Sequence, residues 1–270
     1  MDAVKLGPLV IPMHVALLVA SILLANAVAA WFRASRRVDP SPILWKMIVG
    51  GFGAARLIFV LRHADIYASA PLAALDLRDG GFDSVAGFLT AFVIGAELSR
   101  RTPLLRKSVL TAALVGCVIY IGGNSLNQAL FSAGAPIPAI EVRRLDGSTV
   151  ALTSFADRPV VINLWATWCP PCRREMPAMQ MTQRAHPEIA FVFVNQGESA
   201  QIVNEYLAAQ GLQTQNVVLD PAKLASTRTA SSGYPTTLFY DAKGRLSQRH
   251  MGELSRATLE EKIANLQKLP

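Results

Sequence analysis

The chain has 270 residues, of which 51% are hydrophobic, and a net charge of +7. That length is enough for two domains. Residues 1–137 hold 12 basic and 7 acidic residues, and residues 138–270 hold 14 and 12. The excess positive charge forms short clusters between apolar runs, and the second half has no basic stripe or nucleic-acid motif, so nucleic-acid binding is excluded.

Residues 1–130 contain long apolar runs that predict a membrane domain. A helix needs about 20 apolar residues to cross a bilayer. Four transmembrane helices are expected, near residues 8–31, 43–61, 82–98 and 105–121. The third is the weakest, because it is short and ends with Glu97, and residues 131–137 are predicted to be a linker.

The first run has a second interpretation as a cleaved signal peptide, since Ala25-Asn26-Ala27 resembles a cleavage site. Its positive charges follow the apolar run, however, whereas those of a signal peptide precede it.

Charges in the loops predict the orientation of these helices. The first and third loops are basic, with Arg33, Arg36, Arg37 and Lys46 in one and Arg100, Arg101, Arg106 and Lys107 in the other. The second loop carries Asp65, Asp76, Asp79 and Asp83 against Arg62 and Arg78. Because positive loops stay in the cytoplasm, the N-terminus, the second loop and everything after Ile121 are expected outside.

Part of this half resembles a known membrane family. Residues 53–61 (Gly-Ala-Ala-Arg-Leu-Ile-Phe-Val-Leu), 71–75 and 79–82 resemble the early helices of prolipoprotein diacylglyceryl transferases, which move a diacylglyceryl group from phospholipid to a lipoprotein cysteine. Where that family has His-Gly-Gly, this chain has Val85-Ala86-Gly87, and the later Gly-Arg-x-Gly-Asn segment is missing. The resemblance implies a truncated, inactive membrane scaffold.

Two residues of the membrane half have open roles. Arg56 lies within the second run, where an ionisable side chain is a functional candidate by default. The alternative is that Arg56 snorkels to the outer headgroups. Cys117, in the fourth run, is expected to be a small packing residue, because a lone cysteine cannot cycle as an intramolecular disulfide.

Residues 138–270 alternate between strand and helix patterns, which predicts an α/β domain. Two hairpins are expected, one around Asp146-Gly147 and one around residues 242–244. Apolar strands are expected at 160–165, 189–194 and 217–219, and helices after residue 169, at 200–210 and at 257–269. This order suits a sheet that is covered on both faces.

The chemistry concentrates at residues 168–172 (Trp-Cys-Pro-Pro-Cys), where a strand gives way to a helix. A helix N-terminus carries unpaired N–H groups and partial positive charge, which favour a thiolate and lower the pKa of an exposed thiol from about 8.5. Cys169 is therefore expected to be the exposed nucleophile. Cys172, one turn further and more buried, should resolve the mixed disulfide. Pro170 and Pro171 are tolerated because first-turn N–H groups have no helical partner.

Two other interpretations of the cysteine pair are a structural zinc site and a static disulfide. Zinc needs two more ligands, and His186 and His250 look isolated in the sequence. The strand-to-helix context favours redox work over a static bond. No metal and no cofactor beyond the redox-active disulfide are therefore expected.

The soluble half resembles the TlpA/ResA/CcmG group of thioredoxin-like proteins. The likeness rests on residues 163–177 (Asn-Leu-Trp-Ala-Thr-Trp-Cys-Pro-Pro-Cys-Arg-Arg-Glu-Met-Pro) and 233–237 (Gly-Tyr-Pro-Thr-Thr), and extends from Ile137 to the C-terminus. Members of this group are tethered outside the cytoplasmic membrane and usually act as reductases. The resemblance implies a thioredoxin-like fold, a cis Pro235 facing the cysteines, and substrate binding by Trp168, Tyr234 and Pro235, with the backbone of Tyr234 pairing with an extended substrate segment.

Three further positions carry over from that family. Glu175 matches an acidic residue placed near the cysteines, where it could exchange a proton with Cys172. The alternative is a solvated surface charge. Asn163 stands where thioredoxin has a buried aspartate, so the proton route through that position is absent, which increases the interest in Glu175. Pro177 matches a helix-bending proline.

The function expected from these patterns is that of a membrane-anchored thiol–disulfide oxidoreductase, a reductase of extracytoplasmic protein disulfides. The apolar runs and loop charges predict a multi-pass protein of the cytoplasmic membrane whose thioredoxin-like domain faces the periplasm or cell exterior. The resemblance implies a membrane thiol transporter as electron donor, and cytochrome c biogenesis as one process served. Oxidases and isomerases share the motif, so the direction of electron flow stays open. The alternatives are a diacylglyceryl transferase-like enzyme with an appended redox domain and a non-catalytic tethered binder that uses the Tyr234 edge.

Overall fold

The computed structural model describes residues 3–6, 9–68, 71–131 and 134–268. Parts of three predicted segments lie outside these ranges: residue 8 of the first helix, residues 132–133 of the linker and residue 269 of the last helix. The chain forms two compact units, one comprising Met13–Leu77 and Gly81–Leu126, the other including Asn127–Pro270.

The first helix begins later than predicted. Ala3–Leu6 (β1) and Leu9–Pro12 (β2) pair as antiparallel strands, and helix α1 spans Met13–Arg36. Proline is disfavoured inside a helix and the preceding Val10 and Ile11 are β-branched, so the helix starts only after Pro12.

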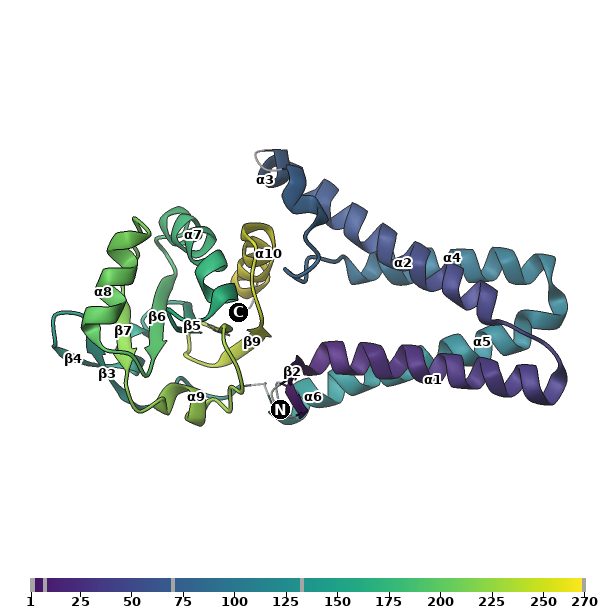
Figure 1. The fold of residues 1–270 in the computed structure, drawn as a ribbon, viewed down its shortest axis with the longest axis horizontal. Helices are drawn as coiled ribbons and strands as arrows, with labels where there is room; N and C mark the ends of the chain where they lie inside the picture. The colour runs from purple at the N-terminus through teal and green to yellow at the C-terminus, as the bar shows by residue number, and fades with distance from the viewer. Residues whose placement is uncertain (1–2, 7–8, 69–70, 132–133, 269–270) are drawn as a thin grey trace. The chain divides into compact units, whose positions relative to one another are not determined.

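Long helices make up most of the helical unit (Figure 1). After α1 come α2 (Ser41–Arg62), α4 (Ser84–Arg101) and α5 (Pro103–Cys117), which continues through a π-helical turn (Val118–Gly122) into α6 (Gly123–Phe131). The loop after α2 holds the short α3 (Ala64–Ala68) and a 3₁₀ turn (Pro71–Leu75).

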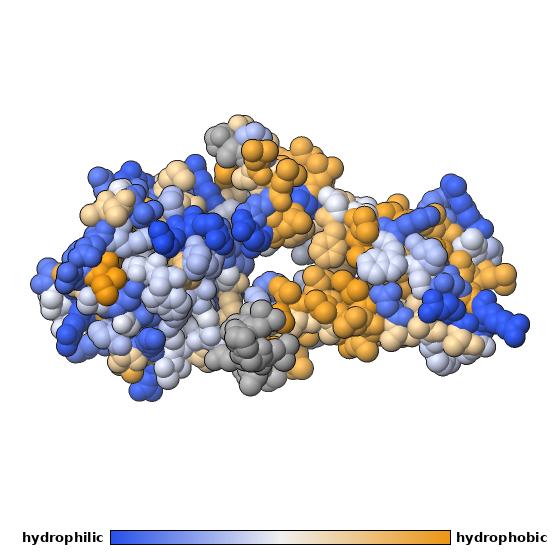
Figure 2. All heavy atoms as spheres, in the orientation of Figure 1, coloured by the Kyte–Doolittle hydropathy of each residue, from blue (hydrophilic) through white to orange (hydrophobic). Residues whose placement is uncertain are grey.

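Among the described residues, three helical stretches are long and apolar enough to cross a bilayer: Met13–Arg36, Ser41–Arg62 and Pro103–Asn127. The predicted third membrane helix is present as α4, but it is not one of these three. Its last turns carry Glu97, Arg100 and Arg101, which lower its apolar character. Large apolar side chains of the helices are exposed, and hydrophobic residues gather on the face of the helical unit that Figure 2 shows.

Helices α2 and α4 pack closely through small residues. A Cβ added to Gly51 would lie 3.0 Å from the carbonyl oxygen of Gly87, and one added to Gly87 would lie 3.0 Å from the Cβ of Ala55. Small residues let helix backbones approach in membranes, where packing replaces the hydrophobic effect as the driving force. Gly87, in the segment Val85-Ala86-Gly87, is thus a packing residue here.

The second unit is built on a seven-stranded sheet (Figure 1). In spatial order its strands are β4 (Thr149–Ala151), β3 (Glu141–Arg144), β7 (Val217–Asp220), β6 (Ala190–Gln196), β5 (Val160–Trp165), β8 (Thr236–Tyr240) and β9 (Leu246–Met251). Strands β5, β6 and β7 are parallel, and the other pairings are antiparallel. The central strands β5 and β6 are buried along their whole length.

Both faces of the sheet are covered, as the sequence predicts. On β5, Val161 and Trp165 join the apolar cluster under helices α7 (Pro170–Ala185), α8 (Ala200–Ala209) and α10 (Arg256–Gln267). The alternate residues of β5 belong to the cluster on the other face, with a 3₁₀ turn (Leu152–Phe155) and the short α9 (Leu224–Arg228). The sequence patterns did not indicate α9, because five residues are too few to show helical periodicity.

Candidate active site

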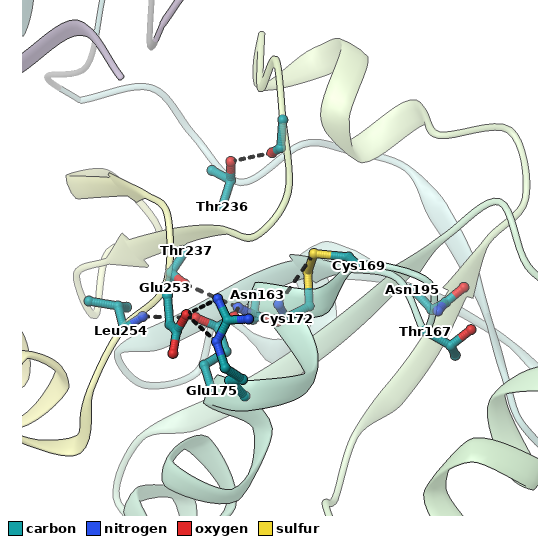
Figure 3. The surroundings of a disulfide bond; sticks show 12 residues. Asn163, Thr167, Cys169, Cys172, Glu175, Asn195, Thr236, Thr237, Glu253 and Leu254 are labelled. Carbon is teal, nitrogen blue, oxygen red and sulfur yellow. Dashed lines mark hydrogen bonds and ion pairs between the residues drawn. A yellow bond between two sulfur atoms is a disulfide. The ribbon is translucent and has the colours of Figure 1, made fainter. Parts of the chain in front are cut away.

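The two predicted reactive cysteines form a disulfide at the start of α7 (Figure 3), with their Cα atoms 5.3 Å apart. The end of β5 leads through a turn to Cys169, which is the N-cap of α7. The Cys169 Sγ accepts a hydrogen bond of 3.3 Å from the backbone N–H of Cys172. Pro170 and Pro171 occupy the first helical turn, where no N–H is needed. The Cys169 sulfur therefore lies at the positive end of the helix dipole.

In this disulfide form both cysteines are buried, so the expectation of an exposed Cys169 is wrong for the oxidised state. The Cys169 residue is 3% exposed and Cys172 is fully buried. The reason is packing, because both belong to the apolar cluster that includes Trp165 and Met176. Trp168, by contrast, is 62% exposed and presents its ring to solvent beside the pair.

Glu175 is buried, which contradicts its interpretation as a solvated surface charge. Its side chain is 1% exposed and lies on α7, one turn after Cys172 (Figure 3). Burial raises the pKa of the Glu175 carboxyl to about 8, against the lowering effect of hydrogen bonds from the Asn163 side chain (2.8 Å) and the Leu254 backbone N–H (3.0 Å). A carboxyl with a pKa near neutrality can both take and release a proton.

Asn163 connects Glu175 to the sheet. From the middle of β5, its Nδ2 donates to Glu175 Oε1 and, at 3.1 Å, to Thr237 Oγ1 on β8. Its Oδ1 is buried and accepts no hydrogen bond from the part of the chain that the structure describes. The residue that stands in place of thioredoxin's aspartate thus holds the carboxyl of Glu175 in position.

The Tyr234–Pro235 peptide bond is cis, as predicted. Pro235 precedes β8, and its carbonyl oxygen accepts from the Gly252 backbone N–H at 3.0 Å. The Tyr234 ring lies edge-to-face against the Trp168 ring, with centroids 6.0 Å apart. The loop of Pro235 is thereby adjacent to the segment that carries Cys169.

One carboxylate near the cysteines was missed by sequence reasoning. Glu198 accepts hydrogen bonds from the backbone N–H of Thr167 (2.7 Å), the Thr167 hydroxyl (2.5 Å) and the Asn195 side-chain amide (2.6 Å). It ties the segment before Cys169 to the loop after β6. The only sequence signal was the position of Glu198 just after a predicted strand, at the same end of the sheet as the cysteines.

His186 is not isolated, contrary to expectation. Its Nδ1 lies 2.9 Å from Glu188 Oε1 and its Nε2 lies 2.8 Å from Glu260 Oε2. The bond to Glu260 joins the end of α7 to α10. Within the described ranges, no group of three or more His, Cys, Asp or Glu side chains could hold a metal ion.

In the helical unit Arg56 is buried and points into the protein, which contradicts the snorkelling interpretation. Its guanidinium donates to backbone carbonyl oxygens of the loop after α2, those of Ala73, Ala74, Asp76 and Gly81, at 2.7 to 3.2 Å. The rings of Phe59, Tyr67 and Phe82 surround it. Arg56 therefore organises this loop. Cys117 is an unpaired, partly buried cysteine in the last turn of α5.

Comparisons with known proteins match the half that contains the cysteine pair. The Redoxin family model matches residues 132–266. The thioredoxin-like protein YneN of Bacillus subtilis is 28% identical over 169 residues, covering 59% of this chain and 98% of that protein. The thiol-disulfide oxidoreductase ResA of Geobacillus thermodenitrificans is 26% identical over 172 residues, covering 63% of this chain and 96% of ResA. A thioredoxin-family thiol:disulfide interchange protein from Chlorobium tepidum is 27% identical, with a TM-score of 0.44, and covers 49% of this chain and 96% of that structure.

Proposed function

We propose that this chain, which belongs to the Redoxin family, is a membrane-anchored reductase of extracytoplasmic protein disulfides. The enzyme class, a thiol–disulfide oxidoreductase, is the one that relatives such as ResA are named for. The main observation behind the proposal is the Cys169–Cys172 disulfide at the N-terminus of α7, where the Cys169 sulfur accepts a hydrogen bond from the Cys172 backbone N–H.

The reaction transfers two electrons from the reduced cysteine pair to a partner disulfide. The Cys169 thiolate attacks one partner sulfur, forms a mixed disulfide and displaces the other partner sulfur as a thiolate. Cys172 then loses its proton and attacks the Cys169 sulfur, which releases the second partner thiol. The domain is left with the disulfide seen in the structure.

Glu175 is proposed to exchange the proton of Cys172 during the second step. It follows Cys172 by one helical turn, so both side chains lie on the same side of α7. With burial raising its pKa to about 8, the carboxyl is close to half-ionised under mildly alkaline conditions and can accept a proton without a large energetic cost. Asn163 and the Leu254 N–H hold it in place.

Trp168, Tyr234 and Pro235 are proposed to form the substrate surface. Trp168 is the exposed residue beside the cysteines, and the Tyr234 ring packs against it. An extended partner segment would pair with the backbone at Tyr234 as an added strand, which places its disulfide next to Cys169.

The helical unit is proposed to anchor the protein in the cytoplasmic membrane as a multi-pass domain. The three apolar candidate spans support membrane anchoring. With α4 as a fourth crossing, the basic residues at the ends of α1 and α4 lie on the cytoplasmic side, which supports an orientation in which the soluble domain faces the periplasm or cell exterior. Reduction of the disulfide after each cycle then requires an electron donor on that side. We propose a membrane thiol transporter for this step, with apocytochromes c among the candidate substrates.

The proposal is tested by trapping partners in cells. Cys172→Ser removes the resolving thiol, so Cys169 should accumulate in mixed disulfides whose partners mass spectrometry can identify. Cys169→Ser/Cys172→Ser is the negative control, and Cys117→Ser in the Cys172→Ser background should trap the same partners. Failure to recover any disulfide-linked protein would contradict the proposal. The steady-state redox state of the wild-type pair decides direction, since a reductase is kept mostly reduced and an oxidase mostly oxidised.

A further inference from the structure

Two consecutive amide side chains, Asn195 and Gln196, lie fully buried at the end of β6. Neither takes part in the proposed reaction. Successive side chains of a strand point to opposite faces of the sheet, so the two amides extend in different directions from one rigid point. Burying an amide costs free energy unless its hydrogen-bonding groups have partners. The hydrogen bonds of Asn195 and Gln196 connect them to the two sides of the proposed substrate surface, Trp168 and Tyr234.

Hydrogen bonds through Glu198 connect Asn195 to the segment before Cys169. Its Nδ2 donates to Glu198 at 2.6 Å, and its Oδ1 accepts from the Glu198 backbone N–H at 3.3 Å. Glu198 in turn holds both the N–H and the hydroxyl of Thr167. Figure 3 shows Thr167 and Asn195 close together beside Cys169. Because Thr167 directly precedes Trp168, these bonds fix the segment that carries the exposed indole.

Hydrogen bonds through Ser226 connect Gln196 to Tyr234. Its Nε2 donates to Asp220 Oδ2 at 3.2 Å, and its Oε1 accepts from the hydroxyl of the buried Ser226. A serine hydroxyl has one hydrogen, which this bond uses. In the 3.2 Å contact between Ser226 Oγ and the Tyr234 hydroxyl, the tyrosine is therefore the donor.

Asp220 anchors the buried end of this series of hydrogen bonds. Its carboxylate also accepts from the backbone N–H groups of Leu224 (2.9 Å) and Ala225 (2.7 Å) at the start of α9. Four polar groups, from Asp220 through Gln196 and Ser226 to Tyr234, thus form one connected chain from the sheet to the surface. A satisfied buried network of this kind restricts the positions of its members.

We infer that Gln196 and Ser226 are positioning residues that hold the Tyr234 side chain against Trp168, and so select polypeptide disulfides over small ones. This inference rests on the proposed function, because it assigns Trp168 and Tyr234 to the substrate surface. A polypeptide substrate must lie along that surface for its disulfide to reach Cys169. A small disulfide reaches the sulfur without using the surface.

The test compares two disulfides with the same leaving group. Reduced full-length protein in detergent reacts with 5,5′-dithiobis(2-nitrobenzoate), or with a ten-residue peptide whose single cysteine is disulfide-bonded to 5-thio-2-nitrobenzoate. Ser226→Ala removes the hydroxyl that joins Gln196 to Tyr234. It should lower the rate constant for the peptide about fivefold, the loss of roughly one hydrogen bond, and leave that for the small disulfide unchanged. Thr227→Ala is the matched control, since the exposed Thr227 hydroxyl bonds to the Lys223 carbonyl oxygen, and it should alter neither rate.

A second variant breaks the same series of hydrogen bonds at Tyr234. Tyr234→Phe should lower the peptide rate to a similar extent, and the double variant with Ser226→Ala should be no worse than either single one, because both remove the same contact. Additive losses, equal losses with both disulfides, or an unchanged peptide rate in Ser226→Ala would overturn the inference. A wild-type protein that reacts with neither disulfide would overturn the proposed function itself, and the inference with it.

Discussion

The stability of the oxidised soluble domain in a Glu175→Gln variant, relative to wild type, should increase as the pH rises from 5 to 8. Burial raises the pKa of Glu175 to about 8 from an ordinary value of 4.5. Below pH 4.5 the carboxyl is protonated in both the folded and the unfolded chain. Above that pH the unfolded chain releases the proton while the folded chain keeps it, so the free energy of unfolding falls until the pH passes the folded pKa. Glutamine has no such titration.

The magnitude follows from the two pKa values. Each unit of pKa difference corresponds to about 1.4 kcal/mol, so the stability that Glu175 costs should grow by about 3 kcal/mol between pH 5 and pH 8. The assay is urea unfolding of the oxidised full-length protein in detergent, with the folded soluble domain detected by its resistance to pulsed proteolysis.

The control for this experiment is Glu205→Gln, which changes an exposed glutamate on α8. It makes the same carboxyl-to-amide change at an exposed position and should not reproduce the gain of about 3 kcal/mol between pH 5 and pH 8. If Glu175→Gln showed no such gain, Glu175 would titrate as an ordinary carboxyl, and the proposed proton exchange with Cys172 would lose its basis.

Three further predictions concern packing and charge outside the cysteine pair. Gly87→Leu should lower the thermal stability of the helical unit in detergent by roughly 1–3 kcal/mol, because α2 and α4 approach there, whereas Val85→Leu on an exposed position should not. Arg56→Lys should make the loop after α2 more sensitive to protease, because a lysine cannot reproduce the planar set of donors that binds four carbonyl groups; unchanged cleavage would refute this role. Burial lowers the pKa of His186, but its bonds to Glu188 and Glu260 outweigh that effect and raise it above 6.5. The stability from these bonds is therefore present below pH 6.5 and lost as the pH rises through the raised value, so His186→Gln should cost more at pH 6 than at pH 9 in urea unfolding.

Local patterns in the sequence predicted much of the soluble domain. The strand at 160–165 was predicted to the residue, because a continuous apolar run between Pro159 and the cysteine segment has one sensible interpretation. The cysteine pair and the cis proline were found from short motifs. The first helix was placed too early, because an apolar run shows where a helix can lie and not where it begins.

Contacts between distant segments could not be predicted in this way. Thr167 and Glu198 are 31 residues apart, and Gln196 and Ser226 are 30 apart, so no local periodicity relates them. The burial of Glu175 likewise depends on Leu254, which lies 79 residues away. The direction in which Arg56 points depends on how the following loop folds back over α2.

The pH dependence of Cys169 alkylation tests the central claim most directly. Full-length Cys172→Ser protein, fully reduced, is treated with iodoacetamide over a range of pH values, and modification of Cys169 is followed by mass spectrometry with Cys117 as an internal reference. A thiolate stabilised at the start of α7 should give a half-maximal rate clearly below about pH 8.5, the value for a free cysteine. A half-maximal rate at or above that pH would contradict the proposal that Cys169 is the nucleophile.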